Sequence, residues 1–140
     1  MHLMYDPELV KPMKEELTKN GVQELKIPED VDNIINRNQG TLLIMVNSVC
    51  GCAAGSARPG LILALKNKKI PDNIVTVFAG VDREATEQAR KYFKNYLPSS
   101  PSMFLFKDQD IVFALQRHDI EGKKPEEISK ILSEAFNKYC

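Results

Sequence analysis

The chain has 140 residues, and its 19 lysine and arginine residues balance its 19 aspartate and glutamate residues. This length predicts one domain over residues 1–140, large enough to be stable without disulfides or a bound metal. With 43% hydrophobic and 27% charged residues, the composition is typical of a soluble globular protein. Because the charges balance and neither half is polarised, we expect neither a nucleic-acid partner nor a membrane partner.

The hydrophobic runs are too short for a membrane span. The longest, among them Leu42–Val46 and Leu61–Leu65, have five residues each, whereas a span requires about 20. The first residues, Met-His-Leu-Met-Tyr-Asp-Pro, lack the basic region and apolar stretch of a secretory signal. We therefore expect a cytoplasmic protein.

Apolar residues at helical spacing predict helices at the start of the chain, and a continuous apolar run predicts the first strand. In chain order these elements are a helix over Pro7–Asn20 that ends at Gly21, a short helix from Pro28 that ends by Gly40, a strand over Thr41–Asn47 and, after Ser48–Gly55, a helix running to about Lys68. The strand is apolar throughout, which is typical of a strand buried on both faces of a largely parallel sheet.

The second half continues the alternation and then adds a hairpin. Its predicted elements are a strand over Asn73–Ala79, a helix with Asp82 as its N-cap that reaches Tyr96, a hairpin of Met103–Phe106 and Ile111–Leu115, and a last helix from Pro125. Strands separated by helices pair in parallel through right-handed crossovers, and a tight hairpin pairs antiparallel. The pattern therefore predicts a mixed sheet with helices on both faces.

Three cysteines, Cys50, Cys52 and Cys140, are too few to form a disulfide framework. Cys50 and Cys52 flank Gly51 at the predicted turn from strand into helix. Backbone N–H groups at a helix N-terminus stabilise a thiolate and can lower a cysteine pKa from about 8.5 to roughly 3.5–7.5. We interpret Cys50, ahead of the helix, as the nucleophile and Cys52, in its first turn, as the resolving cysteine.

The C-x-C spacing bears on the kind of redox chemistry. Side chains two residues apart diverge, so a Cys50–Cys52 bond requires an irregular backbone, which Gly51 permits. Such a bond should be strained and easily reduced, which favours an oxidising or isomerising role over that of a strong reductant. The small residues Ala53, Ala54 and Gly55 leave room for a bulky disulfide partner.

Two other interpretations of the cysteine pair remain open. Buried cysteines often act only as small hydrophobic side chains. A structural zinc site needs four ligands, and beyond the pair the chain offers only the distant Cys140 and two scattered histidines, His2 and His118. We expect no metal within one subunit. The alternative function is a non-catalytic metal-handling or adaptor module that holds a soft ion, Cu(I) or Zn(II), at a subunit interface.

Pro101, which precedes the hairpin, marks a special backbone position because proline cannot donate to a sheet ladder. A cis Ser100–Pro101 peptide would leave the N–H and C=O of Ser100 free for a peptide or thiol ligand. Only about 5% of X–Pro bonds are cis, so the residues alone favour a trans turn.

The element order is that of the thioredoxin-like fold, and four segments closely resemble the bacilliredoxin family: Asn47–Gly55, Ala57–Pro59, Ser99–Ser102 and Arg117–Gly122. The resemblance implies a three-layer α/β/α sandwich with a mixed sheet and an antiparallel edge hairpin. It implies a cytoplasmic thiol-disulfide oxidoreductase that removes bacillithiol from client proteins, with weak disulfide-isomerase activity in some members. It also implies a cis Pro101 facing the cysteines.

By the same resemblance, the protein needs no bound cofactor. Its partners are thiolated client proteins and a small-thiol reductant, with bacillithiol as co-substrate, and we expect a monomer or weak homodimer. Ser100 and Pro101 are the expected substrate-binding residues. Arg58 either binds the carboxylates of an anionic small thiol or is an ordinary surface arginine. His118 could tune a sulfur, although capping or packing a loop is the favoured expectation, and Cys140 is expected to be a bystander.

Overall fold

Five strands form one mixed sheet in the computed structural model, which describes residues 5–140. The strands are β1 (Gln23–Glu24), β2 (Thr41–Asn47), β3 (Asn73–Phe78), β4 (Ser102–Lys107) and β5 (Asp110–Leu115), in the spatial order β1-β3-β2-β4-β5. β1, β3 and β2 are parallel, whereas β2–β4 and β4–β5 are antiparallel. His2 and most of the segment inspected for a secretory signal lie outside the described residues.

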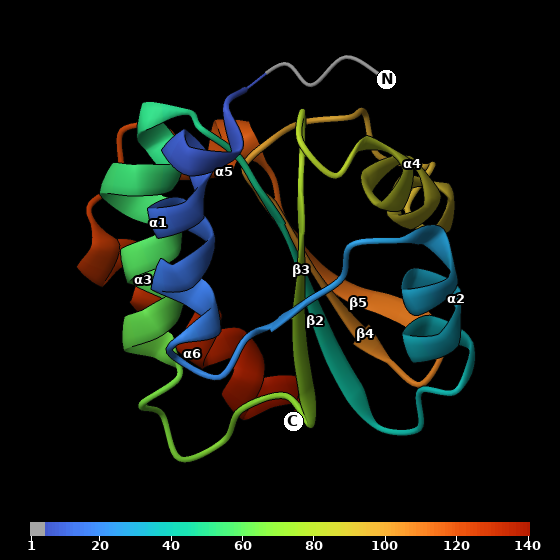
Figure 1. The fold of residues 1–140 in the computed structure, drawn as a ribbon. Coiled ribbons are helices and arrows are strands. Elements are labelled where there is room, and N and C mark those ends of the chain that lie inside the picture. The colour runs from blue at the N-terminus through green and yellow to red at the C-terminus, as the bar shows by residue number, and fades with distance from the viewer. Residues whose placement is uncertain (1–4) are drawn as a thin grey trace.

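Helices cover both faces of this sheet (Figure 1). One layer contains α1 (Pro7–Thr18), α3 (Arg58–Ala64) and α6 (Pro125–Tyr139), and the other contains α2 (Pro28–Asn36) and α4 (Arg83–Tyr92). A short helix, α5 (Arg117–Ile120), follows β5. The predicted three-layer α/β/α sandwich with its edge hairpin is confirmed. No helix within residues 5–140 has the length and apolar character needed to cross a bilayer.

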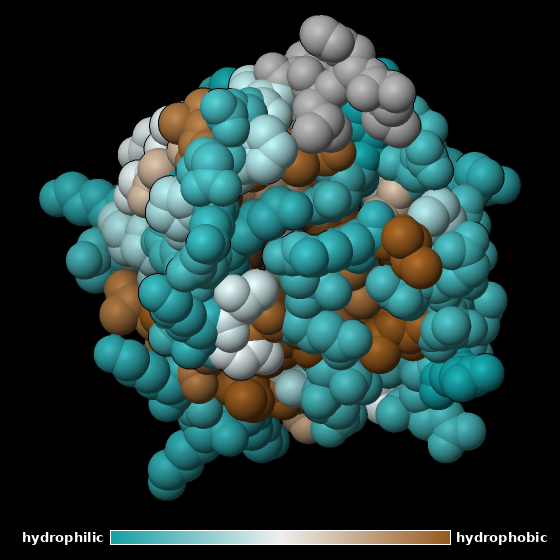
Figure 2. All heavy atoms as spheres, in the orientation of Figure 1, coloured by the Kyte–Doolittle hydropathy of each residue, from teal (hydrophilic) through white to brown (hydrophobic). Residues whose placement is uncertain are grey.

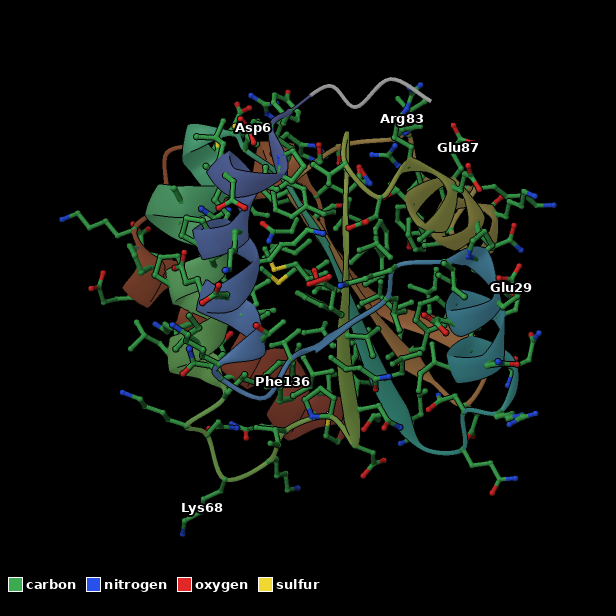
Figure 3. All side chains as sticks on the ribbon, viewed as in Figure 1. Asp6, Glu29, Lys68, Arg83, Glu87 and Phe136 are labelled. Carbon is green, nitrogen blue, oxygen red and sulfur yellow. The ribbon has the colours of Figure 1, made fainter. Side chains whose placement is uncertain are left out.

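The central strand β2 is buried along its whole length. Leu43 and Met45 pack into the core on the α3–α6 side, whereas Leu42, Ile44 and Val46 pack into the core on the α2–α4 side. Both faces of the strand are therefore apolar, as the uninterrupted run predicted. In Figure 3 Phe136 lies between α6 and the sheet, whereas Lys68 projects outward. Hydrophilic residues cover most of the face in Figure 2.

Several boundaries differ from the sequence prediction. The helix α4 ends at Tyr92, because Phe93 leaves the helical conformation and stacks on Phe104 with the ring centroids 4.0 Å apart. Tyr96 then meets the same Phe104 ring edge-on. The helix α3 ends at Ala64 rather than near Lys68. The end of α4 is thus set by tertiary packing, which local spacing does not encode, whereas α3 gives way to turns closed by the N–H groups of Lys66 and Asn67.

Two elements were not predicted, and one predicted cap works differently. The two-residue β1 and the four-residue α5 are too short to show a period. Asp82 does occupy the N-cap position of α4, but its side chain makes no cap bond. It instead pairs with Lys14 Nζ at 2.7 Å, which connects α1 to the start of α4.

Candidate active site

The cysteine pair lies where β2 gives way to the next helix. The carbonyl of Cys50 accepts hydrogen bonds from the N–H groups of Ala53 and Ala54 at 2.9 and 3.3 Å. Cys50 therefore stands at the start of the helix and Cys52 in its first turn, as predicted. A π-helical segment, η1 (Ala53–Ala57), then leads into α3. Such segments occur frequently at functional sites.

The pKa values of the two thiols are shifted in opposite directions. Burial by itself raises the pKa of Cys50, but hydrogen bonds from the Cys52 backbone and thiol, the charge of Arg117 and the Ala53 N–H bring that pKa below its ordinary value. The Cys52 N–H lies 3.4 Å from the Cys50 Sγ. The thiol of Cys52 donates to Cys50, and this bond, burial and the Cys50 charge raise the pKa of Cys52. The asymmetry favours Cys50 as the attacking sulfur, with Cys52 kept as a thiol.

Gly51 adopts no left-handed backbone conformation in this dithiol state, and a Cβ added there would meet nothing within 4 Å. The open cysteine loop therefore does not itself require a glycine. The backbone freedom expected of Gly51 is relevant only to closing a Cys50–Cys52 bond.

Arg58 lies beneath the cysteine loop, with only 3% of its side chain exposed. Its Nε donates to Glu16 Oε1 at 2.8 Å, and its Nη1 donates to Asn47 Oδ1 and to the Ser48 carbonyl at 2.9 Å each. The expectation of an ordinary surface arginine is wrong, because the side chain is buried. Its Nε and Nη1 are bonded to protein acceptors, and the expected contact with a ligand carboxylate stays a prediction.

A short series of hydrogen bonds connects this guanidinium to Cys50. Asn47 Oδ1, which accepts from Arg58, also accepts from the Ser48 N–H at 2.8 Å. The Cys50 N–H in turn donates to Ser48 Oγ at 2.9 Å. The Asn47 amide donates to the Met13 carbonyl of α1 at 3.3 Å. The backbone that carries the nucleophile is thus fixed from below by side chains of β2, α1 and α3.

The Ser100–Pro101 peptide is cis, as the resemblance implied. Pro101 is buried, and the hydroxyl of Ser102 donates to the Ser99 carbonyl at 2.9 Å. The carbonyl of Ser100 is not entirely free, because Arg117 Nη1 lies 3.5 Å from it. Val46, near the end of β2, pairs with Ser102 at the start of β4, so the proline loop and the cysteine turn lie at the same end of the sheet. The Arg117 charge also acts on both cysteines.

Arg117 is the site residue that sequence reasoning missed. For His118, capping or packing a loop was the favoured expectation and tuning a sulfur the alternative; its side chain is 75% exposed and lies 3.4 Å from the Asp119 carboxylate. Arg117 precedes it as the first residue of α5. The hairpin register contains the signal: Leu115 pairs with Met103, which places residue 117 near residue 101.

The third cysteine is distant from this site. Cys140 follows α6 at the surface, and burial raises its pKa, with the hydroxyl of Thr41 acting in the opposite direction. Thr41 begins β2, whereas the cysteine pair follows the other end of that strand. Within the part of the chain that the structure describes, no three His, Cys, Asp or Glu side chains are grouped to hold a metal ion.

A thiol pair at a strand-to-helix turn, facing a cis-proline loop, defines a thioredoxin-fold thiol protein. Solved thioredoxins have the same fold. The reduced thioredoxin of Schistosoma mansoni matches with a TM-score of 0.56 and 18% identity, over 85% of this chain and 98% of that one. Oxidised mitochondrial thioredoxin 3 of Saccharomyces cerevisiae matches with a TM-score of 0.56 and 15% identity, over 88% of this chain and 98% of that one.

Sequence relatives narrow the class. A family model described as disulphide isomerase matches residues 5–140. A bacilliredoxin of Halalkalibacterium halodurans is 46% identical over 97% of this chain and 94% of its own length. One of Bacillus licheniformis is 48% identical over 97% and 95%. The chain belongs to the bacilliredoxin family, and its function is thiol redox chemistry of the oxidoreductase type.

Proposed function

We propose that this protein removes a small thiol, bacillithiol, from mixed disulfides on client proteins. The strongest support is the asymmetry of the two sulfurs: the Cys52 N–H lies 3.4 Å from the Cys50 Sγ, and the pKa is lowered at Cys50 and raised at Cys52. A thiolate is the species that attacks a disulfide. The relatives named bacilliredoxins point to the same small thiol.

The first step is an exchange at sulfur. The Cys50 thiolate attacks the bacillithiol sulfur of the mixed disulfide, a Cys50–bacillithiol bond forms, and the client cysteine leaves as a thiolate that takes up a proton. No net oxidation occurs, because one disulfide replaces another. In this proposal the cis-proline loop, with Ser100 and Pro101, lines the approach of the client backbone. The pairing of Val46 with Ser102 supports this, because it brings that loop and the cysteine turn to the same end of the sheet.

The second step regenerates Cys50 by one of two routes. In the first, Cys52 loses its proton, attacks the Cys50 sulfur and releases bacillithiol, and the resulting Cys50–Cys52 disulfide takes two electrons from an external thiol reductant. In the second, a free bacillithiol thiolate attacks the adduct, which restores Cys50 and releases bacillithiol disulfide. No bound cofactor takes part in either route. In this proposal the protein works in the reducing cytoplasm as a monomer or weak homodimer. It also has weak disulfide-isomerase activity.

The test uses a trapping variant, Cys52→Ser with Cys140→Ser, so that Cys50 is the one remaining thiol. This variant is incubated separately with the oxidised forms of bacillithiol, glutathione and coenzyme A, and the adduct on Cys50 is followed by intact mass. We expect the fastest adduct with bacillithiol. A client peptide carrying bacillithiol on its cysteine should then lose it to the trapping variant at a matching rate.

The control is the same variant with Cys50→Ser added, which should form no adduct. If the trapping variant formed no bacillithiol adduct while Cys50 remained open to alkylation, the proposed substrate would be wrong. If glutathione reacted faster than bacillithiol, the oxidoreductase class would stand and the assignment of the small thiol would not.

A further inference from the structure

A single side chain joins the two halves of the active site. Arg117 Nη1 lies 3.5 Å from the Ser100 carbonyl, and the Arg117 N–H donates to Ser99 Oγ at 3.4 Å, so the start of α5 rests against the cis-proline loop. Its positive charge also acts on both sulfurs, lowering the pKa of Cys50 and opposing the rise at Cys52. Arg117 therefore lies where a group attached to Cys50 would be held.

The guanidinium of Arg117 is available to a ligand, unlike that of Arg58. Its side chain is 46% exposed. Its Nε is paired with Glu121 one turn later in the chain, and within residues 5–140 the one partner of Nη1 is the Ser100 carbonyl, at 3.5 Å. An exposed ion pair of this kind contributes little stability. Glu121 therefore restrains the arginine side chain but leaves its guanidinium accessible to solvent and to a ligand.

The charge balance of the exchange reaction points to the ligand. In the free protein the positive charge of Arg117 favours the thiolate form of Cys50. When Cys50 enters a mixed disulfide, its sulfur becomes neutral. The positive charge of Arg117 is then no longer balanced by a negative charge on that side. A carboxylate carried by the small thiol restores the pairing, and arginine binds carboxylates through two parallel hydrogen bonds.

We propose that Arg117 binds the carboxylate of the small thiol while that thiol is joined to Cys50, so that the site selects anionic small thiols over neutral and cationic ones. The proposal rests on the proposed function, because it assigns the substrate contact within the same site. It transfers to Arg117 the part that the sequence had suggested for Arg58. The other charged groups of α5 and the residue after it are Glu121, which competes for the guanidinium, the exposed His118 and the partly buried Asp119, whose carboxylate accepts from the Gln116 N–H.

The experiment compares disulfides of different charge in the trapping variant. Oxidised bacillithiol and oxidised glutathione are anionic, hydroxyethyl disulfide is neutral and cystamine is cationic. Rates are measured at a pH where Cys50 is fully a thiolate in every variant, established by its ultraviolet absorbance. Arg117→Gln should slow the two anionic reagents about fivefold relative to the neutral one, the scale of one exposed charge pair, and should speed cystamine.

Two further variants sharpen the comparison. Glu121→Gln releases Arg117 from its pair and should favour the anionic reagents, whereas Arg117→Lys should retain part of the preference. The matched control is Arg37→Gln. Arg37 is an exposed arginine that follows α2, at the end of the sheet away from the cysteines, so its replacement should leave the ratios of rates between reagents unchanged.

The decisive result is the ratio of rates between reagents. Equal slowing of all four disulfides by Arg117→Gln would overturn the proposal and leave Arg117 acting only on the Cys50 sulfur. Failure of the proposed function would look different. In that case bacillithiol disulfide would form no adduct, while the glutathione-to-hydroxyethyl ratio would still decide whether Arg117 selects for charge.

Discussion

Replacing Arg58 should both destabilise the protein and weaken its nucleophile. In Arg58→Ala the Ser48 carbonyl loses its side-chain donor, Asn47 Oδ1 keeps only the Ser48 N–H, and Glu16 loses its partner. Hydrogen bonds to a charged donor contribute about 1.5–3 kcal/mol each. Glu16 is 34% exposed and recovers water, so the two buried acceptors dominate, and we expect a loss of about 3–5 kcal/mol.

The assay is denaturant unfolding of the reduced protein, combined with the rate of Cys50 alkylation as a function of pH. The freed Ser48 no longer fixes the Cys50 N–H, so the alkylation midpoint should move upward toward that of an ordinary cysteine. Arg58→Lys keeps the charge but lacks the planar fork, and should recover part of the stability with less recovery of the midpoint. If Arg58→Ala lowered the free energy of unfolding by less than about 1 kcal/mol, the range of an ordinary surface substitution, the proposed support of the cysteine loop by Arg58 would be refuted.

Two further predictions concern the cysteine pair and the packing behind it. Because hydrogen bonds from Cys52 lower the pKa of Cys50, the Cys50 thiolate should form at lower pH than the thiolate of a free cysteine. Cys52→Ala should raise the pH midpoint of Cys50 alkylation more than Cys52→Ser, because serine keeps a side-chain donor. Identical midpoints in the two variants would contradict the role of the Cys52 side chain in lowering this pKa. Gly60→Ala places a Cβ 2.6 Å from Ile128 Cβ and Cγ2, so it should cost about 1–3 kcal/mol in denaturant unfolding. Gly51→Ala, where a Cβ meets open space, is the matched control and should leave the stability of the reduced protein unchanged or slightly higher.

The cysteine loop could be predicted because its determinants are local. The apolar run of β2 requires burial on both faces, and Cys50 follows it within three residues. The start of α6 at Pro125 was predicted for the same kind of reason, since proline suits the first turn of a helix. Such features depend on a few consecutive residues and on general backbone preferences.

The role of Arg58 could not be predicted in this way. Its ion-pair partner Glu16 is 42 residues away and belongs to α1, so the pairing depends on how two helices pack on one face of the sheet. Its place near the cysteine motif suggested a ligand contact. A charged side chain becomes buried only when the fold provides partners for it, and the partners here are known only once the helices are placed.

Arg117 was missed because of an irregularity in the hairpin. Simple pairing outward from Lys107 and Asp110 would oppose Met103 to Ala114, but a shift in register near Leu105 and Phe106 opposes it to Leu115. One extra residue on the bulged strand thus changes which side chain arrives beside the cis-proline loop. Apolar alternation does not reveal such a bulge, so the placement of Arg117 required the structure.

The two arginines divide between them the tasks that a thiol-exchange site requires. Arg58 is buried, paired with Glu16 and bonded to the loop, and its charge does not figure among the causes that shift the Cys50 pKa. Arg117 is half-exposed and weakly paired, and its charge does act on the sulfur. A buried cation bonded to several protein acceptors holds geometry, whereas an exposed cation can respond when the sulfur changes from thiolate to disulfide. Arg58, the arginine nearest the cysteines in sequence, therefore supports the loop. Arg117, which the hairpin brings to the cis-proline loop, is the arginine proposed to bind the substrate.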